Sequence, residues 1–266
     1  MRSEFLEAGS RRCNSLLRLA IVSISGIWLA GSAVFGRDYE PMTRTQIHEA
    51  LANPSASHRV DLRDKDFRGL DLSGVNFKRA DLFGTHMHGV KLRGANFEGC
   101  NLDLTILRGA NLEGANLKNA SIFGVVLVDA NLKGADLSNA RLIADLQRAN
   151  LEGAKLVHGK FAADMKNQPM GKLHVSMVNA NLKGADLTGT DLSGCVLKFA
   201  NLSGANLTGT NLSTCDLRGA DFTNAVLTRA KLDRTLIGGA VFTGITGKDS
   251  ITGLEQAQGR EDARFD

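Results

Sequence analysis

Residues 110–120 read ANLEGANLKNA and contain two successive copies of a five-residue motif with a large apolar residue at its centre. Such centres recur every five residues over 17 units within residues 62–142. After a shift of one residue near 143–145, four more centres follow within 146–161, and 14 further centres occupy 177–242. All 35 are Leu, Phe, Ile or Met, so one structural unit is repeated along most of the chain.

The period of five matches neither an amphipathic helix, at 3.6 residues, nor a strand, at two. It fits a chain that turns by about 90° after each short extended piece and points two side chains inward per unit. The second inward residue lies two before the centre and is usually small, as at Ala110 and Ala185. An Asp or Asn residue before the centre can form hydrogen bonds with the backbone of a turn. A Gly residue two positions after the centre, as at Gly114, allows the backbone to turn at the corner.

This A-(D/N)-L-x-x pattern, over about residues 60–244, resembles the pentapeptide-repeat family. The resemblance implies an all-β fold, a right-handed quadrilateral β-helix with four units per coil and just under nine coils. At about 4.8 Å per coil, such a solenoid would be roughly 42 Å long. Alternating large and small inward residues would fill its narrow square interior.

The two ends of a stacked coil need covers, because they would otherwise expose unpaired strand edges. Thr43 to Leu51 reads as a short helix with a Thr43/Gln46 capping box, so residues 37–59 are predicted to form the N-terminal cap. Residues 245–266 are predicted to form a C-terminal cap and tail. A non-repetitive stretch at about 162–175 is predicted to be a loop insertion.

Residues 1–36 differ from the rest of the chain and predict an export signal. Four arginines precede or open an apolar run of about 15 residues, which ends in the small residues 31–33. This run is short for a membrane span of about 20 residues. The alternative is an uncleaved anchor, in which residues 16–33 remain in the membrane. The predicted location is the periplasm, with a thylakoid lumen or a membrane-anchored position outside the cytoplasm as alternatives.

Composition narrows the classes of function. The formal net charge is +4, and it falls to about +2 if residues 1–36 are removed. No long run of like charge is present, and the phenylalanines of the repeats are mostly at inward positions. Because nucleic-acid binding needs basic patches or exposed stacking surfaces, no nucleic-acid partner is predicted.

No residue pattern predicts catalysis, a cofactor or a metal, so the protein is not expected to be an enzyme. His86 and His88 flank the centre Met87, but Arg68 and Arg108 lie one coil away from His88 and no third ligand is nearby. Cys195 and Cys215 are 20 residues apart, which is one coil. They are predicted to stack as buried free thiols, although their expected spacing would permit a disulfide.

Apolar residues at outward positions mark one face of the predicted solenoid. This face carries the centres of units 62, 82, 102, 122 and 142, and several residues beside them are apolar. An exposed apolar cluster predicts a partner-binding patch, here composed of Phe83, Leu104, Phe123, Val128 and Ile143. The alternative is internal cover, with residues 162–175 folded back over this face.

These observations favour an exported, non-catalytic structural or protein-interaction rod with an unknown protein partner and an undetermined oligomeric state. The alternative is a DNA-mimicking topoisomerase-binding protein of the quinolone-resistance type, as certain members of the family are. Mimicry requires a strongly acidic surface, which this nearly neutral chain lacks. A sugar-cleaving β-helix enzyme would need a groove lined with carboxylates, which the regular units do not provide.

Overall fold

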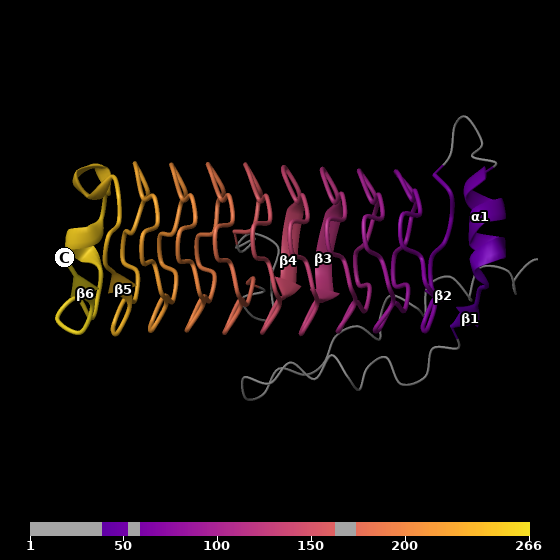
Figure 1. Cartoon of the computed structure of the whole chain (residues 1–266), viewed down its shortest axis with the longest axis horizontal. Coiled ribbons are helices and arrows are strands. Elements are labelled where there is room, and N and C mark those ends of the chain that lie inside the picture. The colour runs from indigo at the N-terminus through magenta and orange to yellow at the C-terminus, as the bar shows by residue number, and fades with distance from the viewer. Residues whose placement is uncertain (1–38, 53–58, 163–173) are drawn as a thin grey trace, which may run out of the picture. The chain divides into compact units, whose positions relative to one another are not determined.

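The computed structural model describes residues 39–52, 59–162 and 174–266, all within one compact unit. The chain winds through successive square coils, stacked along one axis (Figure 1). We name the four faces by their first centre: face A begins at Leu62, face B at Phe67, face C at Leu72 and face D at Phe77. Parallel bridges join residues one coil apart on every face, as between Asp61 and Asp81. The predicted four-sided β-helix is therefore confirmed.

The core is a column of side chains along the axis. All 35 centres are at most 2% exposed, and small residues fill the second inward position. Where that residue is threonine, its hydroxyl donates a hydrogen bond to the backbone carbonyl of a centre residue. Thr85 Oγ1, for example, lies 2.6 Å from Leu82 O. Phe77 and Phe97 stack with ring centroids 4.9 Å apart, at the coil spacing. Burial of each centre contributes about 1.5–3 kcal/mol before conformational entropy is subtracted.

The hydrogen bonds formed by the residue before each centre explain why Asp and Asn are preferred at that position. The Oδ1 atom of Asn111 accepts a hydrogen bond from the backbone N–H of Glu113 at 3.2 Å. The same atom accepts another from Nδ2 of Asn131, one coil further, at 3.1 Å. A short amide thus stabilises both the turn within a coil and the stacking of coils.

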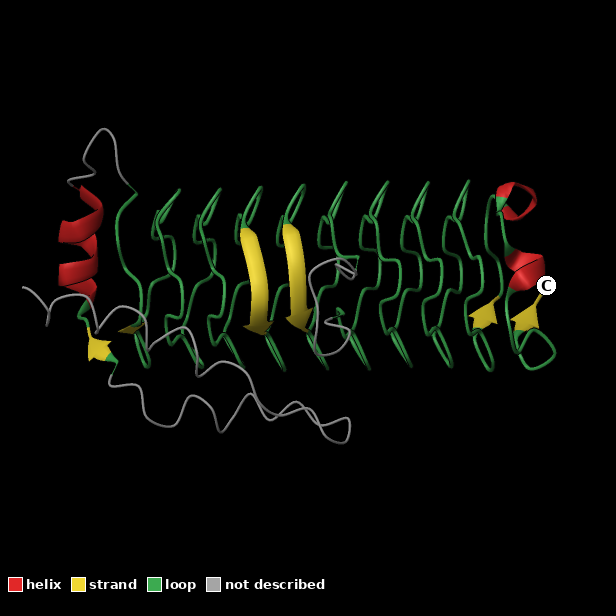
Figure 2. Cartoon of the chain, turned by 180° about the vertical axis from the view of Figure 1, so that it is seen from behind, coloured by secondary structure: helices red, strands yellow, loops and turns green. Residues whose placement is uncertain are grey.

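Two longer strands lie side by side near the middle of the stack (Figure 2). Strand β3 (Ser121–Val126) pairs in parallel with β4 (Arg141–Asp145), with a register shift between Phe123 and Val125. This irregularity accommodates the one-residue shift in the repeat, because only four residues separate the centres Leu142 and Leu146.

The N-terminal end is covered by a helix and a short strand. Strand β1 (Glu40–Pro41) pairs with β2 (Lys65–Asp66), and helix α1 (Arg44–Ala52) lies across the first coil (Figure 1). The capping box forms as predicted, since Thr43 N donates to Gln46 Oε1 at 2.7 Å and Gln46 N donates to Thr43 Oγ1 at 3.3 Å. Ile47 is fully buried against the core. The predicted capping helix is confirmed.

The bridged ladder continues beyond residue 244 into one more coil, which sequence analysis missed. Bridges join Lys231 to Thr252 and Leu236 to Gln258. Strand β5 (Val241–Phe242) pairs with β6 (Arg264–Phe265), and two short 3₁₀ helices, η1 (Lys248–Ser250) and η2 (Leu254–Gln256), lie between. Each side of this last coil has six residues instead of five, so the pentapeptide period does not reveal it.

Two predicted regions, residues 1–36 and most of 162–175, lie outside the described residues. Within the described ranges, no helix combines the length and apolarity required to cross a bilayer.

Candidate docking surface on face A

Three of the five predicted patch residues are half-buried apolar side chains on face A, where Asp103 lies between Phe83 and Phe123 and accepts a hydrogen bond from Phe123 N at 2.9 Å. Phe83, Leu104 and Phe123 come from three successive coils. Leu104 extends over the backbone of Gly124, where an added Cβ would lie 2.6 Å from Leu104 Cδ2. Glycine at position 124 therefore leaves the room that this leucine occupies. We call these three residues the face A patch.

The other two predicted residues do not contribute to this surface. Ile143 is only 2% exposed and Val128 only 5%, so the expectation that they are exposed was wrong. Ile143 alone separates the inward-facing Leu142 and Ala144, whereas the regular unit has two residues at this corner. Val128 follows a face B centre and thus lies around the corner from Phe123. The alternative cover, residues 162–175, falls largely outside the described residues.

Two cations adjoin the patch at its C-terminal side. The Arg141 guanidinium lies 5.0 Å from the centroid of the Phe123 ring, a cation–π contact. Lys160 is the bridged neighbour of Arg141 on the next coil. Both side chains are exposed, and neither forms an ion pair with any described residue. The patch therefore ends in two positive side chains about 4.8 Å apart along the ladder, and Asp191 follows Lys160 on the next coil.

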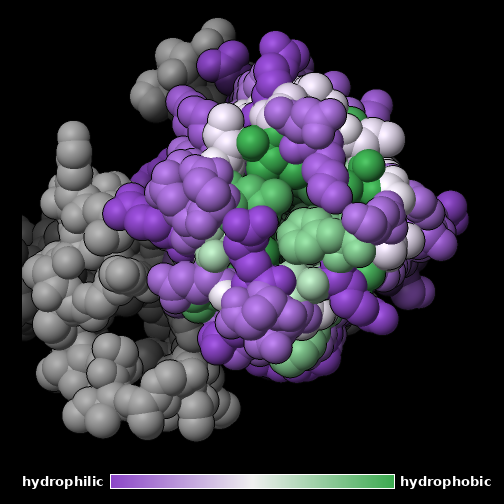
Figure 3. Space-filling view, turned by 90° about the vertical axis from the view of Figure 1, so that its left-hand side faces the viewer, coloured by the Kyte–Doolittle hydropathy of each residue, from purple (hydrophilic) through white to green (hydrophobic). Residues whose placement is uncertain are grey.

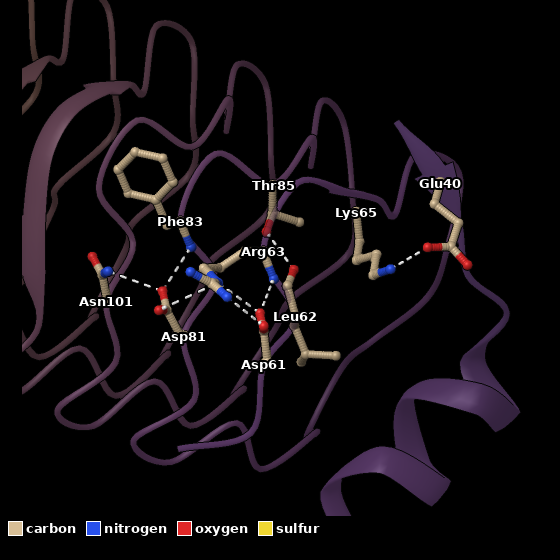
Figure 4. Close-up of polar contacts among 9 residues, drawn as sticks. All are labelled: Glu40, Asp61, Leu62, Arg63, Lys65, Asp81, Phe83, Thr85 and Asn101. Atoms are coloured by element: carbon tan, nitrogen blue, oxygen red, sulfur yellow. Dashed lines mark hydrogen bonds and ion pairs between the residues drawn. The ribbon is translucent and has the colours of Figure 1, made fainter. Parts of the chain in front are cut away.

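The N-terminal side of the patch is charge-compensated (Figure 4). Arg63 bonds Asp61 through two nitrogen atoms, at 2.8 and 2.6 Å, and lies 3.8 Å from Asp81. Asp81 also accepts hydrogen bonds from Phe83 N at 3.2 Å and Asn101 Nδ2 at 2.9 Å. The Arg63 hydrogen bond lowers the pKa of Asp61 to about 2. A carboxylate held ionised in this way is unsuited to general acid or base chemistry near neutral pH.

The described part of the chain places no further metal ligand beside the histidine pair His86 and His88. His86 is half-buried, with its ring centroid 5.2 Å from that of Tyr39, and burial, with a smaller contribution from Arg68, lowers its pKa. His88 is exposed. Among the described residues, no group of three His, Cys, Asp or Glu side chains could hold a metal ion.

The cysteines of the repeats are free and buried. Cys215 Sγ donates to Leu192 O at 3.0 Å, and burial raises the pKa of this thiol to about 12. The same cause raises the pKa of Cys100 to about 12. Such thiols are protonated and lack the reactivity of a nucleophilic cysteine.

One exposed aromatic residue was missed by sequence analysis. Phe199 is 60% exposed, and every other large hydrophobic residue of the described chain is buried or half-buried. Its backbone is left-handed, with φ of 56°, and its ring lies over Gly219. The sequence does contain a signal for this exposure: Phe199 lies two residues after a centre, at a position where glycine or asparagine is usual.

Comparison with known proteins agrees with the fold. The family model described as pentapeptide repeats, in 8 copies, matches residues 58–89, 85–122, 106–143, 176–213 and 211–244. A search of curated protein sequences gave no match.

Two solved structures share the architecture. One is HetL, a pentapeptide repeat protein involved in heterocyst differentiation regulation from the cyanobacterium Nostoc sp. strain PCC 7120. Its sequence is 28% identical to this chain. The alignment covers 85% of this chain and 95% of HetL, with a TM-score of 0.59. QnrB1, a plasmid-mediated fluoroquinolone resistance protein, is 20% identical over 76% of this chain and 93% of its own, also with a TM-score of 0.59. At that identity QnrB1 supports the fold alone. The chain belongs to the pentapeptide-repeat family.

Proposed function

We propose that this protein is an exported, non-catalytic rod that binds a protein partner through the face A patch. The observation that carries the proposal is the juxtaposition of Phe83, Leu104 and Phe123 with the exposed cations Arg141 and Lys160. Apolar area supplies affinity, and charges at its edge supply orientation and specificity. The complementary partner surface is therefore apolar with carboxylates at one side.

The rest of the surface supports binding over catalysis. Several charged side chains form ion pairs between neighbouring coils, as Lys78 with Glu98 at 3.2 Å and Lys133 with Glu152 at 3.2 Å. The depression beside Asp61 and Arg63 has a volume of about 400 Å³ and is lined by charged residues only. Small-molecule sites are predominantly apolar with few polar groups, so this depression does not suit one.

Export is inferred from residues 1–36 alone. Their basic start, short apolar run and small residues at its end favour delivery to the periplasm; a thylakoid lumen is the alternative. N-terminal sequencing of the protein from fractionated cells tests this part separately. A cleaved N-terminus near residue 34 is expected, and full-length protein in the cytosol would contradict export.

The DNA-mimic alternative is disfavoured by charge. A nucleic-acid mimic concentrates acidic side chains on its surface, whereas here lysines and arginines are interspersed with carboxylates on every face. No observation on the described surface favours topoisomerase binding over a different protein partner.

Substitution within the patch tests the proposed docking surface. A photo-crosslinkable residue at position 83 should capture the partner in cells, and Phe123→Asp or Arg141→Glu should reduce its recovery about tenfold, the loss of roughly one hot-spot contact. Phe199→Asp is the matched control, because it introduces the same charge at an exposed phenylalanine on another part of the surface. Undiminished capture by Phe123→Asp, or equal loss with Phe199→Asp, would reject the patch.

A further inference from the structure

The two ends of the solenoid are covered differently. At the C-terminal end, apolar side chains remain visible within a polar rim (Figure 3). At the N-terminal end, α1 lies across the first coil, and the chain just before it runs beside the first two coils. We call this segment, residues 39–41, the N-terminal strap.

Few contacts hold the strap to the solenoid. Its parallel pairing with β2 is two residues long, and Pro41 has no N–H to donate. The carboxylate of Glu40 pairs with the ammonium group of Lys65 (Figure 4), but Glu40 is exposed, and such pairs contribute little to stability. Just beyond the strap, Met42 N donates a hydrogen bond to Asp66 O at 3.2 Å. Attachment of the strap therefore depends largely on the contact made by its first residue.

That residue, Tyr39, packs edge-on against His86 of the second coil. The two ring centroids lie 5.2 Å apart, and the ring planes meet at 61°. Tyr39 is half-buried, whereas both residues of β1 are exposed. The strap thus has its main packing contact with a side chain that can change its charge between pH 5 and 8.

The attached strap leaves the His86 ring poorly suited to a second proton. Its Nδ1 atom is buried and has no hydrogen-bond partner among the described residues. In the neutral ring this nitrogen can be the unprotonated one, whereas both nitrogens carry hydrogen in the imidazolium. Protonation would therefore bury a charged donor without an acceptor, which is unfavourable. Burial accordingly lowers the pKa of His86 from its ordinary value of 6.5.

The charged groups around His86 do not offset this cost. Asp66 is its bridged neighbour on the preceding coil, but Arg68 already donates to that carboxylate at 2.6 and 3.0 Å. Arg68 lowers the pKa of His86 more than Asp66 raises it, and His88 lowers it slightly further. Ile106, the bridged neighbour on the next coil, is uncharged. The strap adds only a neutral phenol and the ion pair described above.

We propose that the N-terminal strap is a pH-dependent cover, which stays attached while His86 is neutral and detaches when His86 takes up a proton. Once the strap is detached, water reaches the ring, and its pKa returns towards 6.5. Below that pH the detached state therefore binds the proton more readily, and detachment becomes more favourable as pH falls. Helix α1 stays in place because Ile47 anchors it in the core. Release uncovers the outer edge of β2, so access to the first coil depends on acidity.

Nuclear magnetic resonance on the protein as purified from the cell tests the proposal. The chain has one tyrosine, so carbon-13 labelling of tyrosine rings reports on Tyr39 alone. Between about pH 7.5 and 5, its ring signals should move to those of a solvated tyrosine in step with protonation of His86. This range stays above the pH at which ordinary carboxylates take up protons.

Amide hydrogen exchange locates the change along the chain. After correction for the intrinsic effect of pH, exchange of the Met42 amide should become at least about threefold faster at the acidic limit, because its bond to Asp66 O is lost. The Ile47 amide, which donates to Thr43 O within the helical cap, should stay protected.

Two histidine variants provide the matched comparison. His86→Phe keeps an aromatic ring beside Tyr39 but cannot take up a proton, so its strap should remain attached at the acidic limit. His88→Phe makes the same substitution at the exposed histidine two residues later, and it should release the strap close to the wild-type pH.

Four results would overturn the proposal. The first is a wild type whose Tyr39 ring signals and Met42 exchange do not change over this range, and the second is release of the strap in His86→Phe at the wild-type pH. The third is loss of release in His88→Phe but not in His86→Phe. The fourth is equal acceleration of the Met42 and Ile47 amides, which would mean that the whole cap unfolds. If His86→Phe does not fold, His86→Asn is the second non-titrating variant, and release at the wild-type pH in that folded variant would also reject the proposal.

Discussion

At the scale of single residues, the position before each centre couples local and long-range order. Its side-chain oxygen accepts a hydrogen bond from the backbone N–H two residues later, and in several columns its amide also donates one to the preceding coil. Asp and Asn share that oxygen, whereas only Asn has the donor. The repeat therefore tolerates either residue wherever the inter-coil bond is absent.

Asn206 separates these two contributions. Its Oδ1 accepts from Thr208 N at 3.1 Å and from Thr208 Oγ1 at 2.7 Å. Asn206→Ala removes the oxygen that accepts both hydrogen bonds and should lower the free energy of unfolding by about 1–2 kcal/mol. Asn206→Asp keeps them and should stay within about 0.5 kcal/mol of the wild type. Urea titration of the two variants measures the difference, and equal destabilisation by both would show that the oxygen is not the stabilising group.

At the scale of elements, the two ends of the stack are built differently. Helix α1 covers the first coil with one buried side chain and a capping box. The last coil is covered by no described element and widens to six residues per side. The helix accordingly has two roles: it seals the core and covers the strand edge of the first coil.

Ile47→Asp tests the second role of α1. A carboxylate at this fully buried position cannot remain ionised against the core, so the helix should detach and expose the first coil. With the strand edge of the first coil exposed, we expect association into larger particles, detected by light scattering, and a lower melting temperature. Thr45→Asp, at an exposed position of the same helix, is the control. Unchanged particle size in both variants would argue against an edge-protecting function.

At the scale of the whole molecule, electrostatics acts through many small contacts between charged side chains. Most ion pairs are exposed, and each contributes little alone. Hydrogen bonds from neighbouring arginines nevertheless lower the pKa of several carboxyls, foremost Asp61, and also Asp66 and Asp129.

These lowered pKa values predict loss of stability in acid. The pKa of Asp61 is about 2 in the folded protein against 3.8 as its ordinary value. Below pH 3.8 the unfolded chain therefore binds the proton more readily, and the stability present above that pH is lost as pH falls toward 2. The melting temperature should decline slightly below about pH 6.5, where the unfolded chain protonates His86 more readily, and should drop more steeply below pH 3.8. Arg63→Gln should reduce this drop, and a curve that stays flat to pH 2 would contradict the linkage.

Much of the architecture could be predicted from the spacing of residues, while the surface could not. Repetition of the centres predicted the four-sided coil, and the Thr43/Gln46 pair predicted α1. The patch was predicted only in part, because exposure depends on how each corner closes. Ile143 occupies a shortened corner and is buried, whereas Phe199 sits in a left-handed corner and projects into solvent.

The sequence by itself determined the inward residues, the column of turn-forming amides and the capping box, because each depends on contacts at a fixed spacing of two, three, five or about twenty residues. Only the tertiary structure decided the extra coil and the burial of Ile143. These features depend on a change of period from five to six and on the geometry of one corner. Such properties arise from the closure of the stack in space, and no local pattern of residues encodes them.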